Sequence, residues 1–561
     1  MNAIMMMAAA AFYAVEPMSS EKYLPDAPPA GGVKGGEVRM IAAKGEYESG
    51  SFVVTSDRDL KDVTAEWSDL VTEDGAKIPA SAIDLKIVVC WYQQGSAWYS
   101  YFSDMTRRIL TPELLVHDEN LIFVDHETKD NYVRCDYRNG VTDWYWTTYL
   151  PGDCGFNGSY YTFRNEWVHD APTLQPFTLE KGRFKQFWLT LGVPKTAKAG
   201  LYRGNVKLKI ENGKCEMAEV PLLVRVLPFE LPHPAVFRDM KRPFEVSMLT
   251  GEARISDEAV AKDFIAHNLR NPHLKTDSEA ELDALGKFGF DTSTLRTILP
   301  CCGISMSYPP APDDRDWKEY QRFRRALSNS VERIRRRFGD KTVPGAYGAD
   351  EAGPTTVMAE RAAWKCVHEA GGRTEVSSQP HDYILFALDT LLLPEQPSPK
   401  RKELVDRFHA SNPDMKIGWY ADPHSGPENP ELARRQYGWQ TWRNNYDTVA
   451  QYCMFVRGWS EFNRPYENGL RSLSFAYAGD RQIIDTLQWE GFREAIDDIR
   501  YGTLLKTLAL EAAASKDVDL MYEGRAALAY LAQVPYETSS LDALRYEMIE
   551  KILRLKEKMK K

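Results

Sequence analysis

The chain has 561 residues, of which 43% are hydrophobic and 27% charged, and its formal net charge is −10. This composition is typical of a globular protein with enough apolar residues for large cores. The acidic balance, with no basic cluster beyond the C-terminal KEKMKK and a helical RIRRR, argues against partners such as nucleic acid or an anionic membrane.

The first 22 residues begin with an apolar run, MNAIMMMAAAAFYAVEP. The run has about the length of a signal-peptide core, although it lacks a positively charged start. It is too short to span a bilayer, so we expect no membrane insertion. We therefore predict that residues 1–22 are a secretion signal and that the protein is exported to the periplasm or beyond. The alternative is a disordered start to a cytoplasmic protein.

Residues 23–235 are expected to form an N-terminal β-sandwich. After a Pro- and Gly-rich linker at 23–36, the sequence contains short β-branched or aromatic runs that turn residues separate. Helical periodicity is scarce there, and many short strands with intervening turns favour two packed sheets. The segment LPFELPHP at 227–234 is expected to be extended, because proline disrupts helices and central strands.

Residues 236–488 change to an alternation of strands and helices, which predicts a (β/α)8 barrel of the TIM type. The clearest helices are predicted at 256–269, 315–338, 355–370 and 399–411. Amphipathic stretches within residues 489–561 predict C-terminal helices packed on the barrel. The eight candidate strands are 243–249, 271–275, 292–300, 344–350, 373–378, 383–389, 416–422 and 448–455.

The main chemical candidate is the segment YGADEAGP at 347–354, in which Asp350 and Glu351 end the fourth predicted barrel strand. Barrel enzymes place their active sites at the C-terminal ends of the strands. Glycoside hydrolysis needs one protonated carboxyl for the leaving oxygen and a second group that stabilises the cationic sugar. Adjacent carboxylates suit a reaction in which the 2-acetamido oxygen of the sugar is the nucleophile. The competing interpretation is that the pair caps the N-terminus of the next helix.

The sequence resembles glycoside hydrolase family 123 and its relatives, including the domain-of-unknown-function family numbered 4091. The resemblance implies an exo-acting, retaining β-N-acetylgalactosaminidase-like enzyme, with Asp350 holding the acetamido group and Glu351 acting as general acid and base. Pro354 follows the pair after Ala-Gly, where the family has proline directly, which leaves the sugar open. Besides the Asp–Glu strand, the segments that carry the resemblance are GEYESGSFVV (45–54), PELLV (112–116), 192–232, WRNNYDTVAQY (442–452) and WEGFREAIDDIRYGTLL (489–505).

Further residues are expected to bind the glycan substrate because they lie at predicted strand ends or in the loops that follow them. Tyr420 matches a tyrosine of the family, Asp389 is predicted to end the sixth strand, and Trp442 is a candidate floor of the sugar pocket. No cofactor is expected. We also expect no metal, because His424 has no partner at ligand spacing. The complete set of predicted substrate-binding residues is Tyr347, Gln379, His381, Asp389, Tyr420, Trp442 and Tyr452.

Two other functions remain open at this point. The protein would be a glycosidase for a sugar without an acetamido group if Asp389 or Asp422 served as a separate nucleophile. Alternatively, it would be a non-catalytic carbohydrate-binding protein on the same scaffold, since a fold alone does not establish a reaction.

Overall fold

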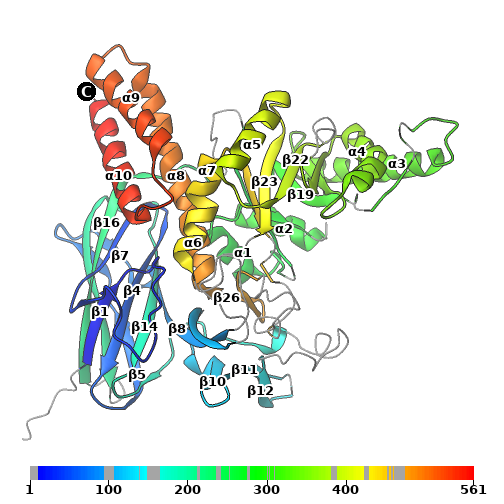
Figure 1. Cartoon of the computed structure of the whole chain (residues 1–561). Coiled ribbons are helices and arrows are strands. Elements are labelled where there is room, and N and C mark those ends of the chain that lie inside the picture. The colour runs from blue at the N-terminus through cyan, green and yellow to red at the C-terminus, as the bar shows by residue number, and fades with distance from the viewer. Residues whose placement is uncertain are drawn as a thin grey trace, which may run out of the picture. The chain divides into compact units, whose positions relative to one another are not determined.

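A computed structural model describes most of the chain between Ala10 and Lys560 (Figure 1). The residues outside the description are 1–9, 94–106, 138, 148–164, 211–214, 235–241, 252, 275–277, 300, 302, 307, 309, 381–387, 423–428, 452–453, 456–458, 460–473 and 561.

The chain divides into two units, each with its own core. The first unit consists of residues 1–231, 425–433 and 457–494, and the second holds the remaining residues up to Lys561. The chain therefore leaves the first unit, builds most of the second and returns. This differs from the predicted domains, which follow one another along the sequence.

The first unit contains two large β-sheets. One has the strand order β2-β1-β4-β14-β8-β9-β26-β25 and the other β13-β5-β15-β16-β3, to which β6 and β7 attach. The first sheet comprises β1 Ala10–Val15, β2 Val33–Lys34, β4 Tyr47–Ser56, β8 Ile83–Gln93, β9 Ile109–Val116, β14 Phe184–Gly192, β25 Tyr477–Gly479 and β26 Gln482–Thr486. The second comprises β3 Val38–Lys44, β5 Leu60–Trp67, β6 Leu70–Thr72, β7 Lys77–Ile78, β13 Phe177–Leu179, β15 Gly200–Ile210 and β16 Cys215–Glu230.

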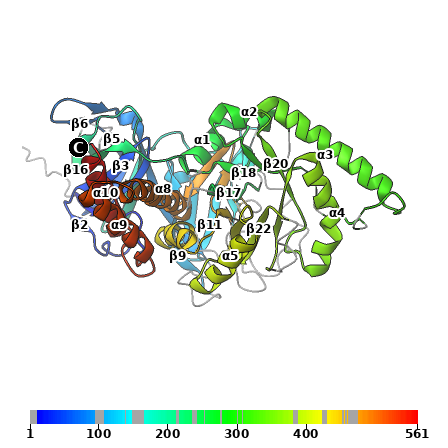
Figure 2. The same cartoon turned by 90° about the horizontal axis from the view of Figure 1, so that it is seen from above.

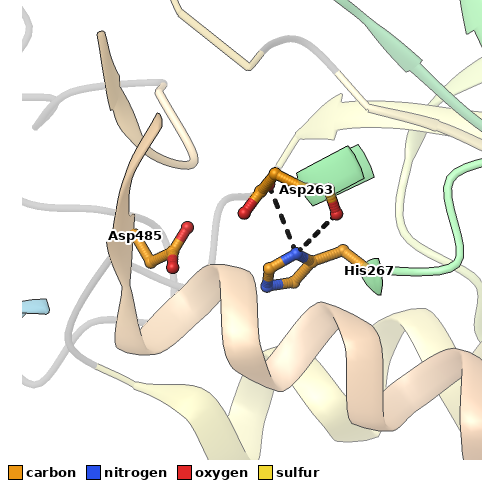
Figure 3. Close-up of side chains that lie close together, drawn as sticks. All are labelled: Asp263, His267 and Asp485. Atoms are coloured by element: carbon orange, nitrogen blue, oxygen red, sulfur yellow. Dashed lines mark hydrogen bonds and ion pairs between the residues drawn. The ribbon is translucent and has the colours of Figure 1, made fainter. Parts of the chain in front are cut away.

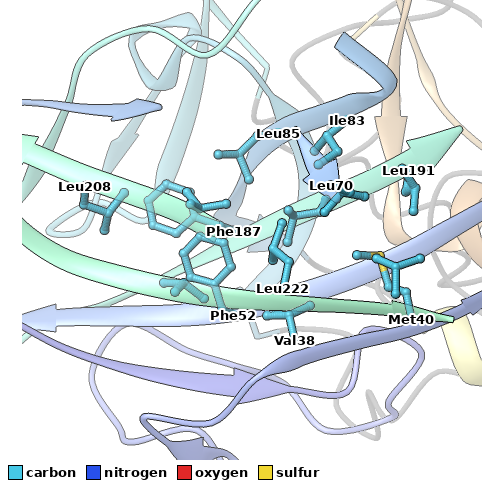
Figure 4. Close-up of a cluster of buried hydrophobic side chains, with 14 of the residues drawn as sticks. Val38, Met40, Phe52, Leu70, Ile83, Leu85, Phe187, Leu191, Leu208 and Leu222 are labelled. Atoms are coloured by element: carbon cyan, nitrogen blue, oxygen red, sulfur yellow. The ribbon is translucent and has the colours of Figure 1, made fainter. Parts of the chain in front are cut away.

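Apolar side chains from both sheets meet in one core (Figure 4). They come from alternate positions along each strand, since neighbouring residues of a strand point to opposite faces. Phe52 of β4 stacks on Phe187 of β14, with ring centroids 5.0 Å apart and an angle of 10° between the rings. Leu208 and Leu222 of the second sheet belong to the same buried cluster. The β-rich N-terminal region is thus built as predicted, as two sheets around an apolar core.

The predicted signal segment contains a strand of this sheet. From Ala10 to Val15 the chain forms β1, which pairs with all of β4 between Ser51 and Ser56. Val15 lies in a small buried cluster with Tyr23 and Val53. Part of the apolar run, Ala10–Val15, is therefore a strand of the sheet, which the sequence analysis did not predict. Export stays a prediction.

A return segment completes the first sheet. Strand β26 pairs antiparallel with β9, so that Asp485 lies opposite Leu115. Asp485, which Figure 3 draws on its strand, is only 3% exposed and pairs with Lys86 of β8. The end of the predicted barrel domain, residues 457–488, therefore needs correction. Its β-hairpin belongs to the sandwich, because the edge of β9 offers hydrogen-bonding groups that β26 satisfies.

A third, small sheet in the first unit has the order β10-β11-β12. Its strands are β10 Ile122–Asp125, β11 Asp130–Asp136 and β12 Thr142–Trp146. Val133 and Cys135 of β11 are fully buried in a cluster with Trp91.

The second unit is a closed barrel of eight parallel strands, as the alternating sequence pattern predicts. Its strands are β17 Glu245–Leu249, β18 Asn271–His273, β19 Thr294–Leu299, β20 Val343–Tyr347, β21 Arg373–Ser377, β22 Thr390–Glu395, β23 Lys416–Asp422 and β24 Thr448–Gln451. The sixth strand is the exception. The prediction placed it at 383–389, of which 383–387 lie outside the described residues, whereas β22 begins with the buried run TLLL and ends at Glu395.

Helices surround the barrel strands (Figure 2) and continue into a C-terminal group. Their bounds are α1 Glu258–Ala266, α2 Glu279–Phe288, α3 Trp317–Phe338, α4 Pro354–Ala370, α5 Pro399–Ser411, α6 Pro430–Arg435, α7 Thr441–Arg443, α8 Leu487–Ala513, α9 Val518–Gln533 and α10 Leu541–Lys558. At the end of α1, His267 Nδ1 lies 3.0 Å from the carbonyl oxygen of Asp263 (Figure 3). Among the helices that the structure describes, none has the length and apolar character of a membrane span.

The barrel interior contains a buried ion network on alternate strands. Glu245 of β17 accepts two hydrogen bonds of 2.9 Å from Arg373 of β21, and it also pairs with Arg296 of β19 and Lys416 of β23. Arg296 extends the network to Glu375 of β21. Burial alone would raise the pKa of Glu245, but its three cationic neighbours hold it well below the usual value. Glu245 is therefore ionised within this network, which supports the strands beneath the C-terminal rim.

Candidate active site

The two predicted catalytic carboxylates lie in the turn between β20 and α4. Tyr347 is the last residue of β20, and α4 begins at Pro354 after its cap residue Gly353. Asp350 and Glu351 are both exposed on the C-terminal rim of the barrel. Neither is the capping residue of α4, so the competing interpretation of the pair as a helix cap does not apply.

Two tyrosine hydroxyls hold these carboxylates. Tyr347 donates to Asp350 Oδ1 at 2.8 Å, and Tyr420 of β23 donates to Glu351 Oε1 at 3.0 Å. Burial raises the pKa of both phenols, and the negative carboxylate beside each raises it further. Both hydroxyls therefore keep their protons and act as donors. The structure thus brings together four of the predicted site residues, from strands β20 and β23 and the loop after β20.

A serine that sequence reasoning missed touches both acidic residues. Ser377 ends the neighbouring strand β21, and its Oγ lies 2.6 Å from Asp350 Oδ1. The backbone N–H of Glu351 donates to the same Oγ at 2.7 Å. The only sequence signal was its position at a strand end, because serine is common and the contact joins segments 26 residues apart.

A buried glutamate fixes the start of the loop. Glu360 of α4 is 1% exposed and accepts hydrogen bonds from the backbone N–H of Ala349 (2.8 Å) and of Gly303 (2.7 Å). Burial raises the pKa of Glu360, and the two N–H donors oppose that effect. A Cβ on Gly348 would lie 2.7 Å from the Glu360 carboxylate, so glycine permits this close approach. The carboxylate therefore ties the loop after β20 to the segment after β19.

Glu351 has a left-handed backbone conformation, with φ of 46°. A non-glycine residue in this region carries strain, and such strain gathers at functional sites. On either side the backbone is fastened, since the N–H of Gly348 donates to the Glu375 carbonyl (2.8 Å) and that of Ala352 to the Ser377 carbonyl (3.0 Å). These backbone hydrogen bonds thus hold Glu351 in a left-handed conformation that glutamate rarely adopts.

Asp389 requires a correction, since it was predicted to line the sugar site. It precedes β22 rather than ending it, which places it at the opposite end of the barrel from Asp350. There its carboxylate accepts from the backbone N–H of Thr374 at 2.6 Å and pairs with His368 at 2.8 Å. The apolar run before it suggested a strand, but the observed strand follows it.

Trp442 also lies away from the site. It belongs to α7, before the first residue of β24, and is 8% exposed. Its ring packs edge-on against Trp439 at 5.3 Å, and both rings face Gly502 of α8. The side chain therefore packs between helices of the second unit, and the prediction that it floors the sugar pocket is corrected.

The remaining predicted residues are distributed differently. Gln379 is exposed two residues beyond the end of β21, next to Ser378. His381 and Tyr452, like the rejected metal candidate His424, lie outside the described residues.

No family model matches the sequence, and no curated protein matches it either. Among solved structures, the chain is similar to a family 123 glycoside hydrolase from Clostridium perfringens, with a TM-score of 0.60, 11% identity and 98% of each chain covered. A β-glucuronidase from Ruminococcus gnavus matches with a TM-score of only 0.30, 10% identity and coverage of 75% of this chain and 98% of that chain. The protein therefore shares, over nearly its whole length, the fold of a family 123 glycoside hydrolase.

Proposed function

We propose that the protein is a glycoside hydrolase that uses Asp350 and Glu351 at the rim of its barrel. The observation that carries this proposal is the pair of adjacent carboxylates, each held by a tyrosine hydroxyl at the C-terminal ends of the strands. Barrel enzymes perform their chemistry at this rim. The likeness of fold to a family 123 glycoside hydrolase is in accord with the proposal.

The finer proposal is a retaining, exo-acting β-N-acetylhexosaminidase, similar to an N-acetylgalactosaminidase. Glu351 donates a proton to the glycosidic oxygen as the bond to C1 breaks. The carbonyl oxygen of the sugar's own 2-acetamido group then attacks C1 and forms an oxazolinium ion, whose N–H the Asp350 carboxylate accepts. Glu351 next removes a proton from water, and the resulting hydroxide opens the oxazolinium at C1 with net retention.

The hydrogen bonds support this division of roles. Asp350 Oδ1 accepts from two hydroxyls, of Tyr347 and Ser377, which hold its carboxylate in place as a hydrogen-bond acceptor. Among the described residues, Tyr420 donates the one hydrogen bond to the Glu351 carboxylate, which is exposed to solvent, as a group that exchanges protons with water must be. A sugar without an acetamido group would need a separate nucleophile. Of the two candidates for that role, Asp389 lies at the other end of the barrel, whereas Asp422 ends β23 at the C-terminal rim and stays the alternative.

The test compares wild type, Asp350→Asn and Glu351→Gln on aryl glycosides with and without a 2-acetamido group. We expect wild type to act on aryl 2-acetamido glycosides and a thiazoline mimic of the oxazolinium to inhibit it. Each substitution should lower kcat by about 10²–10⁴-fold. Because a good aryl leaving group needs little acid assistance, Glu351→Gln should lose less activity on aryl glycosides with good leaving groups than on those with poor ones. Unchanged hydrolysis by both variants would contradict the proposed roles, and activity confined to plain glycosides would contradict the acetamido mechanism.

A further inference from the structure

The neighbours of Ser377 determine which group its hydroxyl donates to and which group it accepts from. The side chain is fully buried at the end of β21. An N–H can only donate, so Oγ must accept the proton of the Glu351 amide, 2.7 Å away. The single hydroxyl proton is then available for Asp350 Oδ1 at 2.6 Å. One side chain therefore contacts the backbone of one acidic residue and the carboxylate of the other.

We propose that Ser377 is a positioning residue that selects which oxygen of Asp350 faces the substrate and holds Glu351 in its left-handed conformation. This inference rests on the proposed function, because it gives Ser377 a role in that reaction. Ser377 touches no reacting atom in the mechanism and acts through its two neighbours.

The choice of oxygen follows from the donors around Asp350. Tyr347 and Ser377 both donate to Oδ1, and within the described part of the chain no donor engages Oδ2. Two donors on one oxygen fix the rotation of the carboxylate about its terminal bond. Oδ2 is then the oxygen presented to the acetamido N–H. A carboxylate held in advance loses less freedom when the transition state forms, which is where such positioning raises kcat.

The hold on Glu351 has a main-chain and a side-chain part. The Ser377 carbonyl accepts the Ala352 N–H at 3.0 Å, while its hydroxyl accepts the Glu351 N–H. Without the hydroxyl, the Glu351 amide would lose its acceptor and the strained φ of 46° would lose a restraint. The carboxyl of Glu351 would then sample positions away from the glycosidic oxygen.

The neighbouring Ser378 offers a matched control. It is 1% exposed, and its hydroxyl donates to the Ala352 carbonyl at 2.6 Å. Ser378 thus fastens the same loop with one hydroxyl but touches neither carboxylate nor the Glu351 amide. A difference between Ser377→Ala and Ser378→Ala separates positioning of the carboxylates from general support of the loop.

The experiment measures kcat and KM for wild type, Ser377→Ala and Ser378→Ala on an aryl 2-acetamido glycoside. For Ser377→Ala we expect kcat to fall by about 30- to 100-fold with KM changed less than about threefold. Ser378→Ala should stay within about threefold of wild type in both kcat and KM.

Equal losses in the two variants, or a loss in Ser377→Ala that appears mainly in KM, would overturn the inference while leaving the proposed function intact. If wild type hydrolyses no glycoside, the proposed function fails, and the positioning is then judged from crystal structures of the two variants. In Ser377→Ala we expect Glu351 to leave the left-handed region and the Asp350 carboxylate to rotate, with neither change in Ser378→Ala. Unmoved acidic residues in Ser377→Ala would refute the positioning role without any activity measurement.

Discussion

At the scale of single residues, the most informative feature is the left-handed conformation of Glu351. A residue with a Cβ in this region is less stable than glycine by about 1–2 kcal/mol. The chain nevertheless places a glutamate there, in the loop that also carries Asp350. The strained backbone at Glu351 is therefore retained because its carboxylate is needed in the site. Variants that lack the carboxylate should reveal the free energy of this strain.

We expect Glu351→Gly to be more stable than Glu351→Ala by about 1 kcal/mol, because both lack the carboxylate and only alanine keeps the strain. The measurement is the midpoint of urea unfolding of each variant. Asp350 is the internal control. Its φ is not positive, so Asp350→Ala should be more stable than Asp350→Gly. The same order at both positions would show that the left-handed conformation of Glu351 carries no strain.

The residues of the site were predictable only where they belong to a local motif. Asp350 and Glu351 follow a strand in the sequence, and Tyr347 ends that strand, so their common rim could be anticipated. Ser377 and Glu360 reach the same loop from β21 and α4, and such tertiary contacts leave no periodic trace in the sequence. Asp389 was placed at the wrong end of the barrel because the apolar run 383–388 has the pattern of a sixth strand. The observed strand β22 begins after Asp389.

At the scale of elements, a partly buried histidine ties two strands of the sandwich to a loop. His117 follows β9, and its Nε2 lies 2.7 Å from Asp84 Oδ1 of β8. Its Nδ1 lies 3.4 Å from Asp170 Oδ2, whose carboxylate also accepts the His117 backbone N–H. Burial alone would lower the pKa of His117, but the hydrogen bonds to Asp170 and Asp84 raise it to about 9.

This raised pKa predicts a loss of stability in alkaline solution. The folded pKa lies above the unfolded value of 6.5, so the contribution is complete below pH 6.5 and lost as pH rises through about 9. Its size is at most about 3 kcal/mol. Urea unfolding midpoints of wild type should therefore fall between pH 6 and pH 9.5, whereas those of His117→Gln should start lower and change less. Parallel pH profiles for the two proteins would argue against the ionised histidine.

The elements themselves were predictable to different degrees. The long helices α3, α4 and α5 are marked by a proline at their start or a glycine after their end, and their predicted bounds lie within a few residues of the observed ones. Strand β1 was not recognised, because an apolar run at the start of a chain fits a signal segment as well as a strand. Its pairing with β4 depends on a partner about 40 residues away.

At the scale of the whole molecule, the sandwich is assembled from distant parts of the chain. Trp459, Tyr477 and Ile484 join Trp91 and Leu114 in one buried cluster of the first unit. Alternation of apolar residues predicts layers, but it does not say which sheet receives the hairpin of β25 and β26. The sequence pattern therefore predicted a β-sandwich and a barrel. It could not show that residues 457–494 belong to the first unit.

The discontinuity predicts that the N-terminal module does not fold well alone. A fragment of residues 1–235 would leave the edge of β9 open and the partly buried Lys86 without Asp485. We expect it to aggregate or to melt without a cooperative transition, as followed by circular dichroism. Joining residues 457–494 to the fragment through a Gly/Ser linker should restore a cooperative melt.

The matched control for this experiment is the same fusion with Ile484→Asp, which places a charge in the buried cluster that β26 completes. This fusion should behave like the short fragment. Cooperative melting of residues 1–235 alone would show that the hairpin is dispensable.

The late arrival of β26 also has a consequence during synthesis. On the ribosome, β9 is made about 370 residues before the strand that covers it. At 5–20 residues per second, the nascent chain would present that unpaired edge for roughly 20–70 s. Chaperones that bind extended apolar segments would have their longest opportunity there, around Leu114 and Leu115, and translation pauses between β9 and β26 should lower the yield of native protein.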